Sequence, residues 1–561
     1  MYRTPATGPN GSSKAHEIKT APAPIGGLNT RDSLANMPPG DCPVLINWIP
    51  DIGGMRSRGG FFEWAINFPS NLPIQSILAY FSATDTFPGG AFVDTPSVLP
   101  GQVFAATNNG IYIITTVTNA PVLSVALSGL ALAGWLSYMM LTNSGGTFML
   151  VCSETDGYKH YNGTVWVTPT FGVGAGQVSG CDPAKFCFVT VWKKRAWFVE
   201  KNSTRAWFLT SEAINGVASL QDFGPLFKKG GHLSYLANWT MDAGEGIDDF
   251  LVAVSSNGDV VIYKGTDPTS AATFGLVGQW YVGQIPIGRR AFTQLGGDLI
   301  LLSTEGIFPV SQITRGGTQL LAASGDYSSK IRPTVGNYTR KTFTSRGWQM
   351  LVHSTERLLV VSTPDSDEVV NNQFAMSTTL NAWTVLSGAP ALCLGATAGY
   401  MLSGTSDGRV LLILNGPADS VPFGSSTGNP VYCTVQYSFN YFESPAIEKQ
   451  FLLARPSFLS VLEPAANLDV AVNFTYTTPQ RAVVGPGTPG TTVWDGDVLD
   501  PYDQFDFGYW DGVPGERALY WADWRSVSGL GYSGAATMSS AHVVRTTLTA
   551  MDYVYQMGGP L

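Results

Sequence analysis

The feature that most constrains this chain is an internal repeat with a period near fifty residues. One unit recurs seven times: an apolar run, a short polar turn and a second apolar run, a pattern that predicts a β-hairpin. The turns fall at residues 110, 157, 205, 258, 306, 357 and 408, so that successive turns are 47, 48, 53, 48, 51 and 51 residues apart. Such even spacing indicates repeated structural units.

Five of the seven turns place a glycine after Asn, Asp or Glu. Glycine supplies the positive φ that tight hairpin turns often need. Arg205 and Arg357 stand at the other two turns, which we expect to be of another type. In the fourth unit, Leu251, Val252 and Val254 should lie in a buried strand, with Val252 and Val254 on one face and Leu251 on the other.

Each hairpin leaves about 30 residues of its repeat, enough for two further strands. Four-stranded units of this length are typical of β-propellers, whereas solenoid repeats are usually shorter. A closed ring of blades also buries both apolar faces of every sheet. We therefore predict an all-β chain with one large β-propeller of about seven blades, six to eight being allowed because the ends of the repeat are hard to count.

The repeat stops on both sides of this region, which predicts four parts. Residues 1–24 are rich in Pro, Gly, Ser and Thr and predict a flexible N-terminal arm. Residues 25–75 predict an N-terminal β segment, residues 76–420 the propeller, and residues 421–561 a β-sandwich-like domain. We expect strands from residues 40–65 to join that C-terminal domain, so that both flanks build it together.

Charged residues are scarce, at 13% of the chain against about 25% in ordinary soluble proteins, and the formal net charge is −9. Few charges favour a surface that partner subunits cover. Lys193-Lys194-Arg195 and Lys228-Lys229 are short basic runs, too isolated for a nucleic-acid patch. Any contact with DNA should therefore be loose and repulsive.

The six cysteines contain no CxxC pair, so we expect small core residues and neither a metal site nor a disulfide framework. The polar N-terminus shows no secretory signal. Pro121–Leu141 is long enough to span a bilayer. Because it contains Pro, Ser and Gly inside the repeat pattern, buried strands are the preferred interpretation and a membrane span the minor one.

Motifs for catalysis are weak. Gly404–Gly408 matches GxSxG, but a β-like run follows it where a nucleophile elbow needs a helix. The five histidines are widely separated. The carboxylate pairs Asp248-Asp249 and Asp495/Asp497 could serve a glycosidase, although solvated loop charges are the default. We predict no enzyme, no catalytic residue, no cofactor and no bound metal.

The segment 494–512 is unusually acidic and aromatic. Its first part, WDGDVLDPYDQFD, has five aspartates but does not match an EF-hand loop. A calcium site and an acidic loop at a wet interface both remain open.

Several motifs carry a family resemblance: Gly26-Gly27-Leu28-Asn29, Met37–Gly40, Asn47-Trp48, Met55–Gly60, Ser329–Pro333 and Ser444–Phe458. In these the chain resembles the tail nozzle, hub or DNA-stabilisation proteins of short-tailed bacteriophages. The resemblance implies a homohexameric ring in the virion, made in the host cytoplasm, which docks below the portal–adaptor ring near tail fibres or spikes. It also implies that double-stranded DNA is retained and then passes through the channel without sequence-specific binding. A carbohydrate-binding or -cleaving propeller at the host surface is the alternative.

A protein that works by assembly should carry its function at interfaces. The candidates are an aromatic anchor, Trp48, and the cations Arg56, Arg58, Lys449 and Arg455, because aromatic and arginine residues are enriched at interface hot spots. A buried Trp48 and solvated arginines are the competing interpretation.

Overall fold

In the computed structural model, the chain forms two compact units. One contains the described residues up to Ser57 and from Pro430 onward; the other contains the described residues of Arg58–Asn429. The structure describes residues 16–82, 96–118, 125–131, 134–242, 247–316, 326–364, 372–422, 428–462, 464–475, 518–521 and 523–558.

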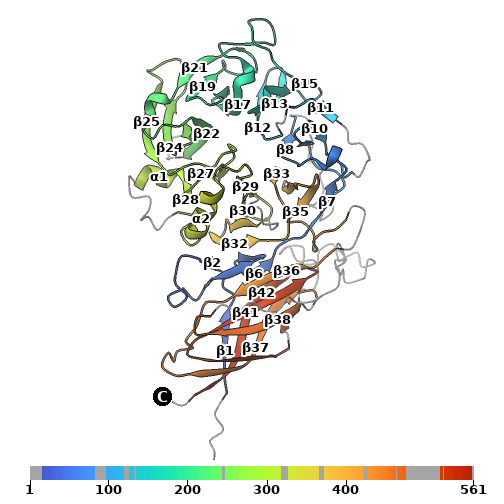
Figure 1. Cartoon of the computed structure of the whole chain (residues 1–561), viewed down its shortest axis with the longest axis vertical. Helices are drawn as coiled ribbons and strands as arrows, with labels where there is room; N and C mark the ends of the chain where they lie inside the picture. The colour runs from blue at the N-terminus through green and yellow to red at the C-terminus, as the bar shows by residue number, and fades with distance from the viewer. Residues whose placement is uncertain are drawn as a thin grey trace, which may run out of the picture. The chain divides into compact units, whose positions relative to one another are not determined.

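The larger unit is a β-propeller of seven blades (Figure 1). The first four blades each contain four antiparallel strands in simple up-and-down order. They are β8 (Ser76–Tyr80), β9 (Gln102–Ala106), β10 (Gly110–Ile113) and β11 (Val125–Ser128); β12 (Leu136–Asn143), β13 (Gly146–Ser153), β14 (Gly157–Tyr161) and β15 (Trp166–Val167); β17 (Phe186–Trp192), β18 (Arg195–Glu200), β19 (Arg205–Phe208) and β21 (Ser219–Asp222); and β22 (Leu233–Asp242), β23 (Ile247–Ser255), β24 (Asp259–Gly265) and β25 (Phe274–Tyr281).

The remaining three blades complete the ring. They are β26 (Phe292–Leu295), β27 (Asp298–Ser303) and β28 (Gly306–Pro309); β29 (Gln349–His353), β30 (Leu358–Ser362), β31 (Gln373–Ser377) and β32 (Ala382–Leu386); and β33 (Cys393–Thr397), β34 (Tyr400–Gly404), β35 (Val410–Ile413) and β7 (Phe61–Ala65). The first strand of each blade lies innermost. Most neighbouring blades contact one another through these strands, while β22 of blade 4 contacts β27 of blade 5. β33 of the last blade contacts β8 of the first, which closes the circle.

The last blade is closed by a strand from the N-terminal side of the propeller. β7 pairs with β35 in antiparallel register, with Phe61 opposite Ile413. The assignment of residues 25–75 to the N-terminal segment is therefore wrong beyond Ser57, and the propeller runs from Arg58 to Asn429, not from 76 to 420. The repeat could not reveal this, because the closing strand has no hairpin partner beside it in the sequence.

The fifth blade departs from the pattern. Its described residues form three strands, followed by α1 (Val310–Gly316) and α2 (Arg332–Thr342), which pack on β28. Neither helix was predicted. Their insertion shifts the phase of the repeat: the hairpin at Arg357 joins the first two strands of its blade, whereas the other six join the second and third. Short helices also occur at η1 (Pro69–Asn71), η2 (Pro183–Lys185) and η3 (Gly224–Leu226), and β16 (Val178–Ser179) pairs in parallel with β20 (Gly216–Val217).

The predicted core placements are confirmed. Leu251, Val252 and Val254 are fully buried in β23. All six cysteines are buried and free. Within Pro121–Leu141, the described residues include β11 and the start of β12, as the strand interpretation requires. Among the described residues, no helix is long and apolar enough to cross a bilayer.

The smaller unit is a β-sandwich of two packed sheets. One sheet has the order β39-β37-β42-β6-β5, with β1 also paired to β42 and β40 to β37; its partner contains β4, β36, β41 and β38, and β2 pairs with β3. The strands are β1 (His16–Pro22), β2 (Gly27–Leu28), β3 (Asp41–Cys42), β4 (Val44–Ile46), β5 (Trp48–Asp51), β6 (Gly54–Ser57), β36 (Val431–Gln436), β37 (Lys449–Ser460), β38 (Ala465–Val472), β39 (Ala518–Trp521), β40 (Arg525–Gly531), β41 (Gly534–His542) and β42 (Thr547–Met557).

Both flanks build this sandwich, as predicted, but the arm was placed wrongly. Residues 16–22 of the expected flexible arm form β1, with His16 opposite Gln556. The polar composition of this stretch concealed it because only alternate residues are half-buried, as on an edge strand with one wet face.

Candidate functional site

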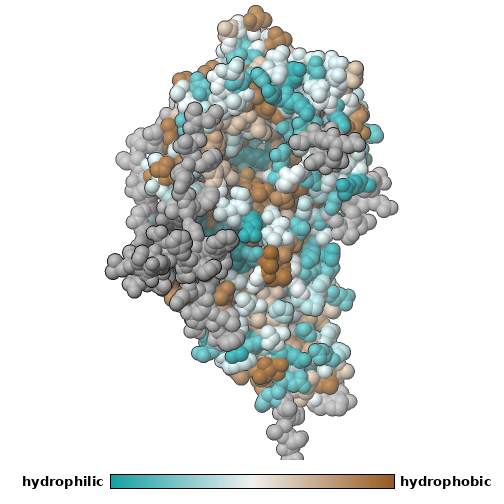
Figure 2. All heavy atoms as spheres, turned by 180° about the vertical axis from the view of Figure 1, so that it is seen from behind, coloured by the Kyte–Doolittle hydropathy of each residue, from teal (hydrophilic) through white to brown (hydrophobic). Residues whose placement is uncertain are grey.

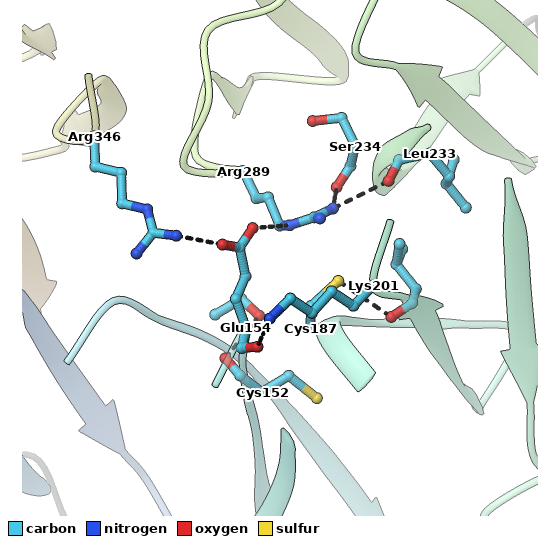
Figure 3. Close-up of polar contacts among 10 residues, drawn as sticks. Cys152, Glu154, Cys187, Lys201, Leu233, Ser234, Arg289 and Arg346 are labelled. Carbon is cyan, nitrogen blue, oxygen red and sulfur yellow. Dashed lines mark hydrogen bonds and ion pairs between the residues drawn. The ribbon is translucent and has the colours of Figure 1, made fainter. Parts of the chain in front are cut away.

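A cluster of charged side chains converges at one mouth of the propeller (Figure 3). Glu154 lies in the turn between β13 and β14, and Lys201 directly follows β18. Arg289 precedes β26, and Arg346 precedes β29. Blades 2, 3, 5 and 6 therefore each contribute one charged residue to the same place.

Glu154 is the centre of the cluster. Its Oε1 accepts a hydrogen bond from Nε of Arg289 at 3.0 Å, its Oε2 accepts one from Arg346, and its main-chain carbonyl accepts one from Nζ of Lys201 at 2.8 Å. Figure 3 shows the two guanidinium groups approaching the carboxylate from opposite sides. Partial burial works against the ionised form, but the charges of Arg289 and Arg346 outweigh it and lower the pKa of Glu154.

Arg289 reaches across to a neighbouring blade. Nη1 donates to the carbonyls of Leu233, at 3.1 Å, and Ser234, at the start of β22. The backbone of Arg289 has a φ of 61°, in the left-handed region that a residue with a side chain seldom adopts. This strained conformation holds a guanidinium that is only 7% exposed over the starts of the inner strands.

Arg290 extends in another direction. Its Nη1 donates to the Gln75 carbonyl at 3.0 Å, and its Nη2 donates to the Leu136 carbonyl at 2.6 Å and to Oγ of Ser76. The guanidinium also lies 5.3 Å from the centre of the Trp135 ring. Since these partners lie at or beside the starts of β8 and β12, Arg290 reaches from blade 5 across the ring to blades 1 and 2 at this end.

The thiols and the imidazole around the cluster do not carry the charges that a nucleophile or an acid catalyst would need. Burial raises the pKa of the Cys187 thiol to about 11 and raises that of Cys152 well above its ordinary value, so both thiols stay protonated. Burial lowers the pKa of His232. A carboxylate held ionised between two arginines is a poor proton donor, so Glu154 does not suit the general-acid role that a glycosidase needs.

The five predicted interface residues divide into buried and half-exposed side chains. Trp48 is fully buried in the sandwich, stacked on Phe458 and edge-on to His542, so the prediction of an interface anchor is wrong and the core interpretation holds. Its aromatic character gave no means of distinguishing a core from an interface. Arg56 is half-buried in β6 and pairs with Asp51 at 3.3 Å, and it stays an interface candidate.

Arg58 is also misassigned as an interface residue. Its guanidinium is 1% exposed and forms two hydrogen bonds with the carboxylate of Asp419, Nη1 to Oδ1 at 2.7 Å and Nη2 to Oδ2 at 2.5 Å. It also donates to the carbonyl of Ser387 at 2.8 Å. Arg58 therefore ties the chain just before β7 to the end of the propeller, a structural role that sequence proximity could not show.

The C-terminal candidates differ in the same way. Lys449 is buried, and its ammonium group donates to the carbonyls of Ser444, Ile447 and Tyr532. It therefore connects the loops that contain these carbonyls. The prediction that Lys449 is an interface residue is wrong. Arg455 is 28% exposed, pairs with Asp552 at 2.9 Å and lies over the Trp524 ring. It stays an interface candidate.

Where the structure describes the candidate catalytic motifs, their residues have structural roles. Gly404–Gly408 forms the turn between β34 and β35, in which Oγ1 of Thr405 bonds Asp407 and the main chain of Arg409. The carboxylate of Asp249 pairs with Lys193 at 2.8 Å. Asp495, Asp497 and the rest of segment 494–512 lie outside the described residues. No cluster of three or more metal-ligating side chains occurs in the described part of the chain.

Neither Arg289 nor Arg290 was among the predicted site residues. Their signal was an Arg-Arg pair in the connection between the fourth and fifth repeats, after a turn-forming Pro-Ile-Gly. Only the ring closure brings Arg289 to Glu154, 135 residues earlier in the chain.

No protein-family profile matches this sequence, and no curated protein matches it either. Solved structures match at the level of the fold. YCF48 from Cyanidioschyzon merolae is 10% identical, with a TM-score of 0.34, over 64% of this chain and 98% of that one. The β-propeller domain of Cps50 (Swd1) from Myceliophteria thermophila is 9% identical, with a TM-score of 0.34, over 56% and 92%. A chain of the BBS1N–ARL6DN complex is 13% identical, with a TM-score of 0.27, over 44% of this chain and 64% of its own length. The order of strands within each blade, not these matches, establishes the propeller here.

Proposed function

We propose that this protein is a structural subunit of a short-tailed phage tail, a nozzle or hub ring that surrounds the DNA path below the portal–adaptor ring. In this role it retains the genome and passes it at ejection, as part of the virion. Its neighbours in the tail are further copies of itself, the adaptor ring, and fibres or spikes.

One observation carries the proposal: two distant parts of the phage-tail resemblance belong to one sheet. Asn47-Trp48 and Met55–Ser57 lie in or beside β5 and β6, and Ser444–Phe458 leads through most of β37. β42 joins the two, pairing with β37 on one side and with β6 on the other. Segments almost 400 residues apart thus form one structural element, as expected if they are parts of one inherited domain.

Exposed apolar residues on the outer surface of the propeller support the proposal that the protein assembles. Val167 of β15, Leu220 of β21, and Leu276 and Val277 of β25 are each at least 36% exposed on outer strands of three successive blades. Figure 2 shows hydrophobic side chains scattered over the visible face, with a few at the top of the propeller. Apolar patches on strand edges are typical of surfaces that another chain covers.

The DNA path in this proposal is the centre of the oligomeric ring and not the axis of the propeller. Arg290 reaches from blade 5 across that axis to the starts of β8 and β12 at one mouth. A net charge of −9 suits a ring that lets DNA slide, because phosphates are repelled.

Native mass spectrometry and negative-stain imaging of the purified protein test the proposal. We expect closed rings, with sixfold class averages, and no tight binding of a DNA duplex at physiological salt. A protein that stays monomeric at tens of micromolar, or that binds DNA tightly, would contradict it.

A further inference from the structure

The charged cluster at the mouth of the propeller carries more positive charge than its own carboxylate can balance. Arg289, Arg346 and Lys201 all contact Glu154, and Arg290 follows Arg289 directly. Three cations therefore contact Glu154, two at its carboxylate and one at its main-chain carbonyl, in a protein whose overall charge is −9. This local excess of positive charge favours an anionic partner.

The cluster combines a rigid base with accessible donors. Arg289 is almost completely buried and fastened by the carbonyls at the start of β22. Arg346, by contrast, is 37% exposed, and Lys201 is exposed directly after β18. A planar guanidinium that is held on one side by Glu154 can still bind a second carboxylate through its remaining N–H groups.

The sequence contains a matching partner. Segment 494–512 has six aspartates, no lysine and no arginine, and its aspartates are interleaved with Trp, Tyr and Phe. Its structure lies outside the described residues, but its charge is fixed by composition. A run of carboxylates is complementary in charge to the cations at the mouth.

We propose that the mouth of the propeller, defined by Arg289, Arg290, Arg346, Lys201 and Glu154, is a docking site for the acidic segment 494–512 of a second copy of this chain. The choice of a second copy rests on the proposed ring. The docking site itself does not, since it depends only on the cluster and on the charge of the segment.

A synthetic peptide with the sequence of residues 494–512 tests the site. The receptor is the full-length chain with its own six aspartates replaced by asparagine, so that its own segment does not compete. Fluorescence anisotropy at low salt should detect binding that Arg346→Ala with Lys201→Ala weakens about tenfold or more, as loss of charge-assisted hydrogen bonds requires. The matched control, Lys194→Ala with Lys341→Ala, removes two exposed cations elsewhere and should change nothing.

Three results would overturn the docking site. They are failure of the peptide to bind, equal binding by the mouth variant and the control, and equally tight binding of a DNA duplex that depends on the same two cations. An aspartate-to-asparagine peptide should not bind, and melting temperatures confirm that every variant is folded.

Zero-length cross-linking tests the source of the segment. A carbodiimide should join Lys201 to an aspartate of 494–512, and mixing unlabelled with ¹⁵N-labelled chains shows whether the link connects two copies. Mixed-isotope links are expected. Links confined to one chain would overturn docking between copies, while peptide binding without rings in the microscope would refute the proposed ring and leave the docking site standing.

Discussion

Blades 4 and 7 have the same strand order, but their outer strands differ in how deeply they are buried. In blade 7, Phe61, Trp64 and Ala65 of β7 are buried, and Val421 and Thr118 form isolated bridges with the strand. In blade 4, Leu276 and Val277 of β25 are about half exposed. The described residues of the inner strands, β22 and β33, are mostly buried in both blades, so the difference concerns the strand at the rim.

The contrast distinguishes an outer strand that closes the propeller, β7, from one that we expect to act in assembly, β25. β7 must be held because it joins the two ends of the ring, and the Arg58–Asp419 pair lies at that junction. β25 closes nothing, so its apolar side chains have no such role within the chain. An uncharged, exposed strand at a sheet edge is costly in a soluble protein unless a partner covers it. We therefore expect damage to blade 7 to affect folding and damage to β25 to affect assembly.

The largest effect should come from a charge inside blade 4. Val252→Asp puts an unpaired carboxylate into a fully buried strand, and we expect it to lower the free energy of unfolding by about 4 kcal/mol or more. Urea denaturation measures this. Val277→Asp, on the outer strand of the same blade, is the control and should unfold at nearly the parental midpoint. Equal losses for the two variants would contradict the distinction between inner and outer strands.

Next in size is the junction of blade 7. Arg58→Ala leaves Asp419 without its bidentate partner at a nearly buried site, and we expect a loss of roughly 3–5 kcal/mol in the same assay. The double variant Arg58→Met with Asp419→Leu removes both charges and should be less damaging than either single change. A loss below about 1 kcal/mol for Arg58→Ala would show that the pair does not hold the ring closed.

Acid should loosen blade 2 before blade 7. Burial lowers the pKa of His160 in β14 to about 4, from an ordinary value of 6.5. The unfolded chain then binds the proton more tightly, so stability is retained above pH 6.5 and falls as the pH drops toward 4, by up to about 3 kcal/mol. The four strands of blade 7 contain no histidine.

Hydrogen exchange, corrected for intrinsic rates, can follow the two blades separately between pH 7 and 4.5. The matched variant His160→Asn should flatten the pH dependence in blade 2, whatever its effect on stability at pH 7. An unchanged slope would assign the acid sensitivity to other groups.

The smallest effect on stability, but a clear one on assembly, is expected at β25. Leu276→Lys with Val277→Lys should change the unfolding free energy by about 0.5 kcal/mol or less, as is usual at exposed positions, because both side chains are already half in water. The same variant should lose rings in native mass spectrometry, since charges block the strand edge. Intact rings would remove β25 from the interface and direct attention to Arg56 and Arg455.

The sequence by itself determined the β-hairpins, their number and the positions of most turns. These depend on neighbours in the chain: alternating apolar residues form strands, and a pair such as Asn257-Gly258, with φ of 93° at the glycine, turns them. The same local rules placed Val252 in a core and the cysteines among buried residues. The sequence also predicted that both flanks share the sandwich.

The tertiary structure decided which side chains meet. Arg58 and Asp419 are 361 residues apart, and Arg289 and Glu154 are 135 apart, so no pattern within a repeat could pair them. Closure of the ring brings β7 to β35, buries Trp64 and directs Arg290 of blade 5 across the ring. Burial is likewise a property of the packed sheets: Trp48, Arg58 and Lys449 have the chemistry of interface residues, and only the surrounding strands make them interior ones.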